Sequence, residues 1–292
     1  MITIFTTPKP FEDAKTIASQ RNAILSWKKM CPFCEIILFG DDYGVKEISE
    51  ELGLKHIPEI KKNEFGKPLL DSLFESAKKY AKNNILCYIS CDIVLLSDLT
   101  SALKNIKFPV YLLAGRRWDL KIENAINFDE SDWQEKWLKK AKEQGRLHGH
   151  CATDYLLFPK NFEHKMPPFA IGVPGWDNWL VYRAKSMEIP VIDATLAVSI
   201  IHQEHDYNYS SFGKVRPKLG GRIEGPQLEK NIRLAGNSLD IMTLIDADWI
   251  LNEPGILKKP PFLRHIMSRI SLFYPWRKLR KLRRQLRHFF SI

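Results

Sequence analysis

A chain of 292 residues, with 45% apolar and 27% charged residues, is long enough to bury a sizeable core as one large α/β domain or two small ones. No apolar run approaches the roughly 18 residues of a membrane span, and residues 1–5 look like a strand and not like a signal peptide. Five cysteines, an odd number, argue against a disulfide framework and favour a reducing compartment. The net charge of +10 is concentrated at one end, because residues 264–292 hold nine Lys or Arg and no Asp or Glu.

The first half of the chain alternates strand and helix patterns. Apolar runs bounded by turn residues predict strands at 2–6, 35–39 and 55–57 and a further strand within 84–96. The helical spacing of apolar residues predicts helices at 11–29, 45–52, 69–83 and around 99–104. This alternation predicts a mostly parallel sheet that is covered by helices on both faces.

The second half is less regular. Strands are predicted at 110–115, 153–158, 191–193 and 197–202, and helices at 131–143 and 176–186. Residues 207–227 are polar and rich in glycine, which suits a mobile lid or an acceptor loop. The first strand is followed by neither a P-loop nor a GxGxxG motif, which disfavours ATPases and nicotinamide-dependent enzymes.

The strand within 84–96 ends in small polar residues and one carboxylate, namely Ser90, Cys91 and Asp92. In an open α/β sheet, ligands bind outside the carboxyl ends of the strands. A single acid at this position is well placed to hold a divalent cation against a diphosphate. Asp92 therefore indicates nucleotide chemistry.

Other residues of the first half offer contacts for a nucleotide. Thr6, Thr7 and Pro8 end the first strand, where a nucleoside could lie, although an ordinary strand-to-helix turn explains them equally well. Asp41 follows the second strand and a glycine, a typical position for an acid that accepts from a base or a ribose hydroxyl. Arg21 lies in the middle of the first helix; if it points back to the sheet edge it faces a phosphate or a sugar, and otherwise it is solvated.

Two carboxylates of the second half are candidates for the sugar-binding side. Asp154 stands at the start of a predicted strand, after small residues. Asp177 lies between Trp176 and Trp179 where a Gly/Pro loop opens a helix, so partial desolvation should raise its pKa towards the range of a general base. The flanking aromatic faces also suit sugar rings. The competing interpretation is a helix N-cap with two core tryptophans.

Imidazoles and carboxylates gather after the strand predicted at 197–202. His202 and His205 in this cluster are suited, together with Asp92, to bind Mn²⁺, which prefers oxygen and nitrogen ligands. A surface histidine pair with no role is the alternative.

Taken in order, these motifs resemble the glycosyltransferases of the GT-A fold, in the nucleotide-diphospho-sugar transferase superfamily. The resemblance covers roughly residues 1–210. The segments that carry it are Ile4-Phe5-Thr6-Thr7-Pro8, Gln20-Arg21-Asn22-Ala23-Ile24, Ile37-Leu38-Phe39-Gly40-Asp41, Ile89-Ser90-Cys91-Asp92-Ile93, Thr153-Asp154-Tyr155, Trp176-Asp177-Asn178-Trp179 and His202-Gln203-Glu204-His205-Asp206. The fold that this resemblance implies is α/β, GT-A-like and Rossmann-related, with a mostly parallel sheet flanked by helices.

The resemblance also implies roles for single residues. Asp177 is similar to the acid that activates the acceptor hydroxyl in inverting members. Asp92 looks like the last acid of the D-x-D metal motif, and His202 or His205 like the late histidine that completes the metal site, for Mn²⁺ or Mg²⁺. The first acid of D-x-D is Ser90 here, so binding of the metal through Asp92 is weaker or assisted by the histidine, and a metal-independent enzyme stays open. The residues expected to bind the nucleotide sugar are Thr6, Thr7, Pro8, Arg21, Asp41, Ser90, Cys91, Asp92 and Asp154.

The cationic end of the chain has its own pattern. Trp276, Leu279, Leu282, Leu286, Phe289 and Phe290 recur at helical spacing between basic residues, and Pro275 fits a first helical turn. A basic amphipathic helix of this kind is expected at an anionic membrane surface, through residues 264–292. Nucleic acid is the alternative target, and it is not expected because the aromatic–leucine stripe favours lipid.

The sequence therefore predicts a glycosyltransferase domain at 1–255 and a basic amphipathic tail at 256–292. The expected reaction moves a sugar from a nucleotide-diphosphate donor to a hydroxyl of a glycan or lipid-linked glycan, with metal assistance and inversion. The expected location is cytoplasmic, peripheral at a membrane surface. The alternatives are a catalytically inactive, membrane-associated nucleotide-sugar-binding protein and a nucleotidyltransferase.

Overall fold

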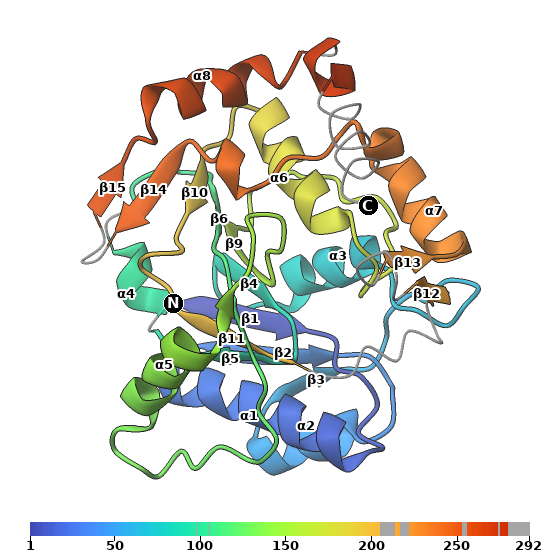
Figure 1. Ribbon diagram of the computed structural model, residues 1–292. Helices are drawn as coiled ribbons and strands as arrows, with labels where there is room; N and C mark the ends of the chain where they lie inside the picture. The colour runs from blue at the N-terminus through green and yellow to red at the C-terminus, as the bar shows by residue number, and fades with distance from the viewer. Residues whose placement is uncertain are drawn as a thin grey trace.

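The computed structural model describes residues 1–97, 99–104, 106–204, 214–216, 222–252, 256–273 and 275–279, with the backbone alone at 214–216 and 222–224 (Figure 1). The strands are β1 (Ile2–Thr6), β2 (Glu35–Phe39), β3 (Lys55–Ile57), β4 (Ile85–Ile89), β5 (Ile93–Leu95), β6 (Leu112–Ala114), β7 (Trp118–Leu120), β8 (Arg146–Leu147), β9 (Tyr155–Pro159), β10 (Val191–Asp193), β11 (Ile200–Gln203), β12 (Lys214–Arg216), β13 (Arg222–Glu224), β14 (Trp249–Asn252) and β15 (Ile256–Lys258). The α-helices are α1 (Ala14–Met30), α2 (Val45–Leu52), α3 (Leu70–Tyr80), α4 (Leu99–Leu103), α5 (Trp133–Gln144), α6 (Trp176–Ser186), α7 (Pro226–Leu234) and α8 (Phe262–Ile270), and two 3₁₀ turns are η3 (Gly236–Ser238) and η4 (Leu244–Asp246). Of the helices described, none is long and apolar enough to cross a membrane.

The described residues form one large sheet of nine strands, in the order β15-β14-β10-β6-β9-β4-β1-β2-β3. Strand β1 is parallel to β2 and β4, and β10 is parallel to β6 and β14. Strand β9 runs antiparallel to both of its neighbours, and β15 runs antiparallel to β14. The predicted mostly parallel α/β sheet is therefore confirmed, with helices on both of its faces (Figure 1).

The alternation of side chains along the strands divides the core into two layers. Ile4 and Leu38 belong to the layer that α1 and α2 cover, whereas Phe5 and Ile37 belong to the layer that α3 and α6 cover. Successive residues of a strand point to opposite faces, so a sheet buried on both sides needs continuous apolar runs. Such runs are what made these strands recognisable in the sequence.

Helix α3 shows how the spacing of apolar residues places a helix on the sheet. Leu70, Leu73, Phe74 and Ala77 recur at the spacing of one helix face, and all four are buried. The ring of Phe74 stacks on that of Phe158 in β9, with 5.6 Å between centroids. The prediction of a helix over 69–83 is thus confirmed, with its ends at Leu70 and Tyr80.

A smaller sheet of four strands, in the order β5-β11-β7-β8, lies beside the large one. The chain leaves the large sheet at Ile89 and enters the small one at Ile93, so Ser90, Cys91 and Asp92 form the turn between the two sheets. Strand β11 pairs antiparallel with β5 and parallel with β7. Strands β7 and β8 were not predicted, and they complete this sheet.

The predicted tail begins inside the large sheet, because β15 pairs with β14 and helix α8 follows it. The helix predicted after Pro275 is described as far as Leu279. Residues 280–292 and His205 lie outside the described residues, as does most of the predicted lid at 207–227, of which β12 and β13 form an antiparallel pair.

Asn22 fastens α1 to the small sheet. Its side-chain amide donates to the carbonyl of Asn124 at 3.2 Å and to Oε1 of Gln203 at 3.0 Å, and its Oδ1 accepts from the backbone N–H of Ile126 at 2.8 Å. The side chain is 2% exposed. Removing one partner of buried hydrogen bonds leaves the other groups unsatisfied.

We expect Asn22→Ala to lower the free energy of unfolding by about 1–3 kcal/mol, because the amide of Gln203 and the N–H of Ile126 lose a buried partner. Denaturant unfolding would measure the change. The matched control is Asn127→Ala, since Asn127 is exposed, and its effect should stay within about 0.5 kcal/mol. Equal effects of the two substitutions would contradict this role of Asn22.

Candidate active site

The carboxyl ends of β1, β2 and β4 meet at one edge of the large sheet. The strand registers place Thr6 beside Leu38, and Phe5 beside Tyr88. Strand β9 is antiparallel, so it begins at the edge where the others end, and its first residue Tyr155 pairs with Ile89. This topology gathers the predicted residues that follow β1, β2 and β4 and precede β9 at a single edge.

At the end of β1, two hydroxyl groups are buried without a hydrogen-bond partner among the described residues. These are Oγ1 of Thr6 and Oγ1 of Thr7. A Cβ on Gly40 would lie 3.3 Å from Oγ1 of Thr7, and the φ of +105° at Gly40 also disfavours any side chain there. Buried polar groups in proteins are nearly always paired. A polar ligand that reaches this edge would supply the missing partner.

The loop after β1 is held by side chains of α1. Gln20 donates to the carbonyl of Lys9 at 2.9 Å and accepts from its N–H at 2.7 Å, and Pro8 between β1 and Lys9 is buried. Asp41, after β2, is 66% exposed and accepts from Nζ of Lys62 at 2.6 Å. That hydrogen bond holds the pKa of the Asp41 carboxyl below its usual value. Lys62 also lies 3.0 Å from Asp42.

The structure does not bring Arg21 to the residues at the carboxyl ends of β1 and β2. Its guanidinium donates to Glu51 of α2, with 2.7 Å from Nη1 to Oε2. Successive residues of a helix are about 100° apart around its axis, so the neighbours Gln20 and Asn22 take the buried directions and Arg21 points along the surface to α2. The expected contact of Arg21 with a phosphate or sugar at the sheet edge is therefore replaced by an ion pair between helices.

The turn that follows β4 is fixed by backbone contacts. The N–H of Ser90 donates to the carbonyl of Asp154 at 2.9 Å, and the N–H of Ile93 donates to the carbonyl of Ser90 at 3.0 Å. The carbonyl of Asp92 accepts from the backbone N–H and from Nε2 of Gln203, both at 3.2 Å. Cys91 is buried, and burial raises the pKa of its thiol well above the usual value. The turn therefore presents Asp92 from a rigid frame.

One row of residues crosses the small sheet beside this turn. In the strand registers His202 of β11 stands next to Asp119 of β7, and Asp119 stands next to Arg146 of β8. In-register residues of neighbouring strands share a face of the sheet. Nδ1 of His202 lies 3.3 Å from Oδ1 of Asp119, and Nη2 of Arg146 lies 3.1 Å from Oδ2.

Two further groups contact the Asp119 carboxylate, which is 4% exposed. Nδ1 of His148 lies 2.8 Å from Oδ2, and Nε of Arg117 lies 2.9 Å from Oδ1. Burial alone would raise the pKa of Asp119, but the hydrogen bonds from His148 and His202 and the charge of Arg117 outweigh it and hold that pKa well below its usual range. In return, the hydrogen bond to Asp119, with a further one to Cys151, raises the pKa of His148 to about 9.

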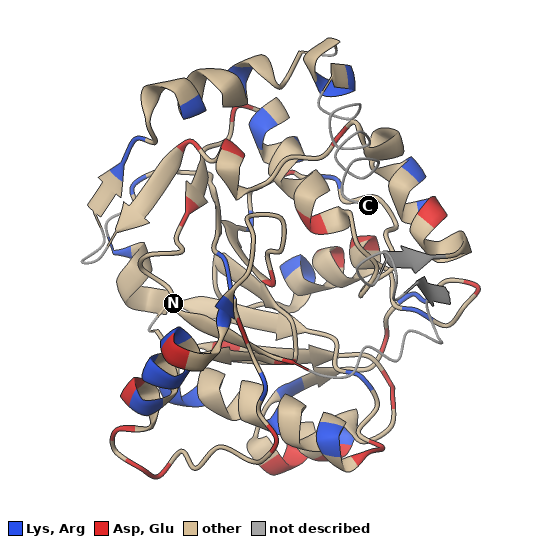
Figure 2. Ribbon diagram, in the orientation of Figure 1, with Lys and Arg blue, Asp and Glu red and all other residues tan. Residues whose placement is uncertain are grey.

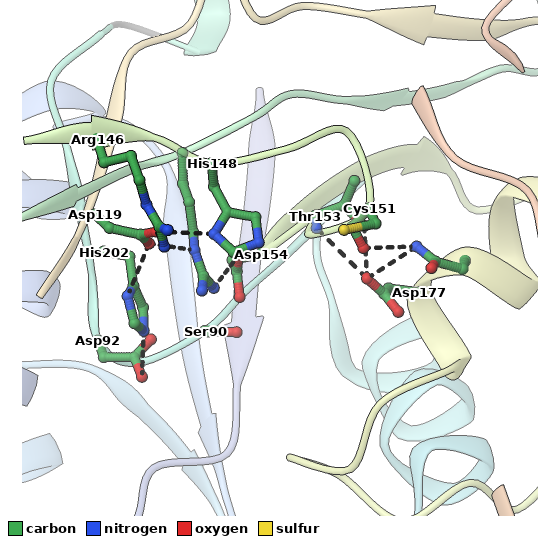
Figure 3. Close-up of polar contacts among 12 residues, drawn as sticks. Ser90, Asp92, Asp119, Arg146, His148, Cys151, Thr153, Asp154, Asp177 and His202 are labelled. Atoms are coloured by element: carbon green, nitrogen blue, oxygen red, sulfur yellow. Dashed lines mark hydrogen bonds and ion pairs between the residues drawn. The ribbon is translucent and has the colours of Figure 1, made fainter. Parts of the chain in front are cut away.

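His202 is 3% exposed, so it is not a surface histidine. With Nδ1 near Asp119, its other nitrogen Nε2 lies 3.7 Å from Oδ2 of Asp92 (Figure 3). An imidazole that is oriented by a carboxylate on one nitrogen is the usual arrangement of a metal-ligating histidine. A carboxylate oxygen and an imidazole nitrogen are donors that suit Mn²⁺. Among the described residues no group of three or more His, Cys, Asp or Glu could hold a metal, and Asp92 and His202 are two such donors that lie near each other.

Asp154 is joined to this row by Arg117, whose Nη1 lies 2.6 Å from Oδ2 of Asp154. Arg117 thus connects two carboxylates, Asp119 and Asp154. The sequence interpretation missed Arg117, Asp119 and His148. The signal was present, because Arg117 and Asp119 follow the strand predicted at 110–115 as Asp92 follows β4.

Asp177 lies in the first turn of α6, after Gly175, which caps the helix with φ 112°. The predicted alternative of Asp177 as the N-cap is therefore wrong. Trp176 and Trp179 are core residues, 7% and 8% exposed, and Trp176 packs edge-on against the ring of Tyr88 at 5.1 Å. Their burial also excludes the expectation that both rings flank a sugar.

The Asp177 carboxyl has few strong partners. Its Oδ2 accepts from the N–H of Thr153 at 3.4 Å, from the hydroxyl of Thr153 at 3.3 Å and from Nδ2 of Asn178 at 3.3 Å. Burial raises the pKa of Asp177 to about 6, and the negative charge of Asp154 contributes in the same direction. The expected rise in pKa is confirmed. This carboxyl changes protonation near neutral pH, whereas Asp119 stays ionised.

Figure 3 shows the resulting arrangement, with Asp92, His202, Asp119, Arg146 and His148 in one group and Asp177 beside Thr153 in another. The first group offers a carboxylate–imidazole pair for a cation. The second offers a carboxyl that can accept a proton.

No model of a known protein family matches the chain, and no curated protein sequence matches it. Among solved structures, the fold is similar to S. aureus TarS 1–349 in complex with UDP-GlcNAc, at 11% identity and a TM-score of 0.49, over 82% of this chain and 66% of that one. It is also similar to the mannosyltransferase PcManGT from Pyrobaculum calidifontis in complex with GDP-Man and Mn²⁺, at 12% identity and a TM-score of 0.44, over 98% of this chain and 85% of that one. A third similar structure is GalNAc-T7 with UDP, GalNAc and Mn²⁺, at 13% identity and a TM-score of 0.45, over 80% of this chain and 48% of that one. These likenesses concern the fold.

We expect Asp119→Asn to bring the pKa of His148 from about 9 down towards the ordinary value of 6.5, because the main group that raises it is removed. NMR titration of the imidazole would measure the change, with exposed Asp129→Asn as the control. The raised pKa stabilises the folded state below pH about 6.5, and this stabilisation is lost as the pH rises through about 9. An unchanged pKa of His148 would contradict the role of Asp119.

Proposed function

We propose that this chain is a glycosyltransferase that moves a sugar from a nucleotide-diphosphate donor to an acceptor hydroxyl. The observation that carries the proposal is that two groups lie at one edge of the sheet. The Asp92–His202 pair follows the carboxyl end of β4, and Asp177, with its pKa raised to about 6, contacts Thr153 just before β9 begins. Nucleotides bind at this edge of α/β sheets. Four of the segments that resemble the GT-A glycosyltransferases, those around Thr6, Asp41, Asp92 and Asp154, lie at the same edge.

The donor is proposed to lie across the ends of β1, β2 and β4. The unpartnered hydroxyls of Thr6 and Thr7 and the close backbone at Gly40 support a nucleoside there. Asp41 would accept from the base or ribose after exchanging its contact with Lys62. The diphosphate would lie at the turn of Ser90, Cys91 and Asp92, as the sequence predicts, with Pro8 and Asp154 at its borders.

Asp92 and His202 would hold a divalent cation, Mn²⁺ or Mg²⁺, with His205 as a further candidate ligand. A cation bound there supplies positive charge that stabilises the leaving diphosphate. Asp119 keeps Nδ1 of His202 engaged, so that Nε2 is the nitrogen directed towards Asp92. Ser90 contributes a hydroxyl where the resembling family has an acid, which leaves the protein with fewer charged ligands.

Asp177 is proposed to act as the general base of an inverting reaction. Its ionised carboxylate would take the proton of the acceptor hydroxyl as the oxygen attacks the anomeric carbon of the donor sugar. The bond from that carbon to the diphosphate then breaks, and the nucleoside diphosphate leaves with the electron pair. A base with a pKa near 6 is ionised at neutral pH and retains a useful affinity for protons.

The acceptor is proposed to be a hydroxyl of a glycan or lipid-linked glycan, with the protein peripheral at a membrane surface. The support is the excess of Lys and Arg in residues 264–292, which contain no Asp or Glu. No nucleic acid partner is proposed.

Incubation of the protein with a panel of nucleotide sugars, with and without Mn²⁺, tests the reaction. The expected result is release of the nucleoside diphosphate, faster with the metal. Binding of a donor without its hydrolysis or transfer would favour the inactive binding protein, and release of pyrophosphate from a nucleoside triphosphate with a sugar phosphate would favour a nucleotidyltransferase. If no nucleotide sugar of the panel is either bound or hydrolysed, the proposal is excluded.

We expect the rate of sugar transfer to fall as the pH drops below about 6, because protonation removes the base form of Asp177. Asp177→Asn should lower kcat by about 10²–10⁴-fold and abolish this acidic limb, as measured by initial rates from pH 4.5 to 8. The matched control is Asp71→Asn, which changes an aspartate in the first turn of α3. If the rate of Asp177→Asn still falls below pH about 6, another residue is the general base.

We expect Asp92→Asn and His202→Gln each to weaken Mn²⁺ binding by about tenfold or more, because each removes one of two adjacent ligands. Titration of Mn²⁺ followed by electron paramagnetic resonance, with a nucleoside diphosphate present, would give the affinity without a need for turnover. Exposed Asp129→Asn serves as the control. If both site variants bind Mn²⁺ with the affinity of the wild type, Asp92 and His202 do not hold the cation.

A further inference from the structure

Helix α8 presents its apolar side chains outward. Phe262 and Leu263 are each 75% exposed and Met267 is 51% exposed. The opposite side of the helix, at Arg264 and Ser268, faces the body of the protein. A surface helix of a globular protein normally buries its apolar stripe and exposes its polar one, so α8 has the reverse orientation.

The polar contacts of α8 fix this orientation. Nε of Arg264 donates to the carbonyl of Ile245 at 2.7 Å, and Oγ of Ser268 donates to the carbonyl of Asp246 at 2.8 Å. Nη2 of Arg264 also lies 3.5 Å from Asp193 at the end of β10. Rotation of the helix to bury its apolar side would break these contacts. The outward apolar face is therefore built into the packing against η4 and β10.

Exposed apolar side chains also occur in the segment that follows. Phe273, Trp276 and Leu279 are 66%, 43% and 53% exposed. Large contiguous apolar surfaces on a protein mark sites of interaction with a partner or a membrane. We call the side chains of Phe262, Leu263, Met267, Phe273, Trp276 and Leu279 the α8 face.

The charge around the α8 face selects the kind of partner. Residues 256–292 contain no Asp or Glu, and Lys258, Lys259, Arg269 and Lys278 are exposed along this part of the chain. Figure 2 shows basic and no acidic positions along α8. A second copy that used the same surface would bring these like charges together, because a two-fold interface pairs a surface with itself. An anionic lipid surface satisfies both the apolar side chains and the cations.

We propose that the α8 face docks on an anionic lipid bilayer, with α8 lying in the plane of the interface. Phe262, Leu263 and Met267 enter the boundary between headgroups and acyl chains, and the exposed Lys and Arg contact acidic headgroups. The docking itself is independent of the reaction. Delivery of an acceptor from the same membrane rests on the proposed function.

Through η4, further hydrogen bonds connect the docked helix to the part of the candidate site that contains Asp177. The N–H of Leu244, in η4, donates to the carbonyl of His150 at 3.1 Å, and the N–H of Met242 donates to the carbonyl of Asn178 at 3.0 Å. Asn178 is the neighbour of Asp177 in α6. A membrane-bound α8 thereby holds the segment that carries the candidate base at a fixed orientation to the lipid.

Co-sedimentation of the full chain with vesicles tests the docking. Vesicles of phosphatidylcholine alone and of phosphatidylcholine with phosphatidylglycerol serve as the probes. We expect binding to the anionic vesicles and a loss of about tenfold or more in affinity for Phe262→Ser/Leu263→Ser, because two exposed apolar side chains are removed. The matched control is Phe33→Ser/Tyr43→Ser, which removes two apolar side chains that are 82% and 71% exposed elsewhere on the surface.

Lys258→Gln/Arg269→Gln should reduce the preference for anionic over neutral vesicles. Equal binding by the wild type and Phe262→Ser/Leu263→Ser would overturn the proposal, since residues 280–292 would then account for the binding alone. A dimer in light scattering that Phe262→Ser/Leu263→Ser converts to a monomer would also overturn it, in favour of a second copy. Without vesicles, Phe262→Ser/Leu263→Ser should hydrolyse the donor as fast as the wild type. If neither the wild type nor any variant hydrolyses the donor, the proposed function is contradicted, and lipid binding still measures the docking.

Discussion

The candidate site depends on the buried carboxylate of Asp119. Arg146 of β8, His202 of β11 and Arg117, which stands just before β7, all contact it. A buried charge that loses its partners costs roughly several kcal/mol, so the position of this acid constrains all the strands around it. The strand register alone places His202 and Arg146 on either side of Asp119, and the ion pairs then fix the side chains. The closeness of His202 to Asp92 follows from this row, because β11 also pairs with β5, which begins one residue after Asp92.

Strand β4 sets the separation between the Asp92–His202 pair and Asp177. Tyr88 within this strand packs against Trp176, the first residue of α6, and Asp92 follows the same strand three residues after its end. The antiparallel direction of β9 is equally important, since it returns Asp154 to the edge between them and lets Thr153 reach Asp177. Core packing of aromatic rings therefore determines how far a cation site would lie from the candidate base. A change in the Tyr88–Trp176 contact would move α6 as a unit relative to Asp92.

The sequence predicted those features that depend on local periodicity. Helix α6 was predicted with its observed ends, and the position of Asp92 after a strand follows from an apolar run that stops at Ile89. Strands β7 and β8 escaped prediction because they are short and carry charged residues, Asp119 and Arg146, at positions that only pairing across the sheet makes favourable. The sequence left the direction of Arg21 open, because helical spacing does not say which neighbouring element a surface side chain meets. Helix α8 was missed as a separate element, although Phe262, Leu263, Ile266, Met267 and Ile270 recur at helical spacing.

Asp119 and Asp177 differ in protonation because their surroundings differ. Asp119 has two arginines and two histidines within 3.3 Å, which favour its ionised form more strongly than burial disfavours it. The groups that act on Asp177 are its own burial, the negative Asp154 and hydrogen bonds of 3.3–3.4 Å from neutral donors, so its neutral form remains accessible. When their surroundings push the pKa values of two acids apart in this way, one acid keeps a structural charge and the other can transfer a proton. Arg117 bears on both assignments, because it neutralises Asp119 and binds Asp154. Asp154 in turn supplies the negative charge that contributes, after burial, to the raised pKa of Asp177.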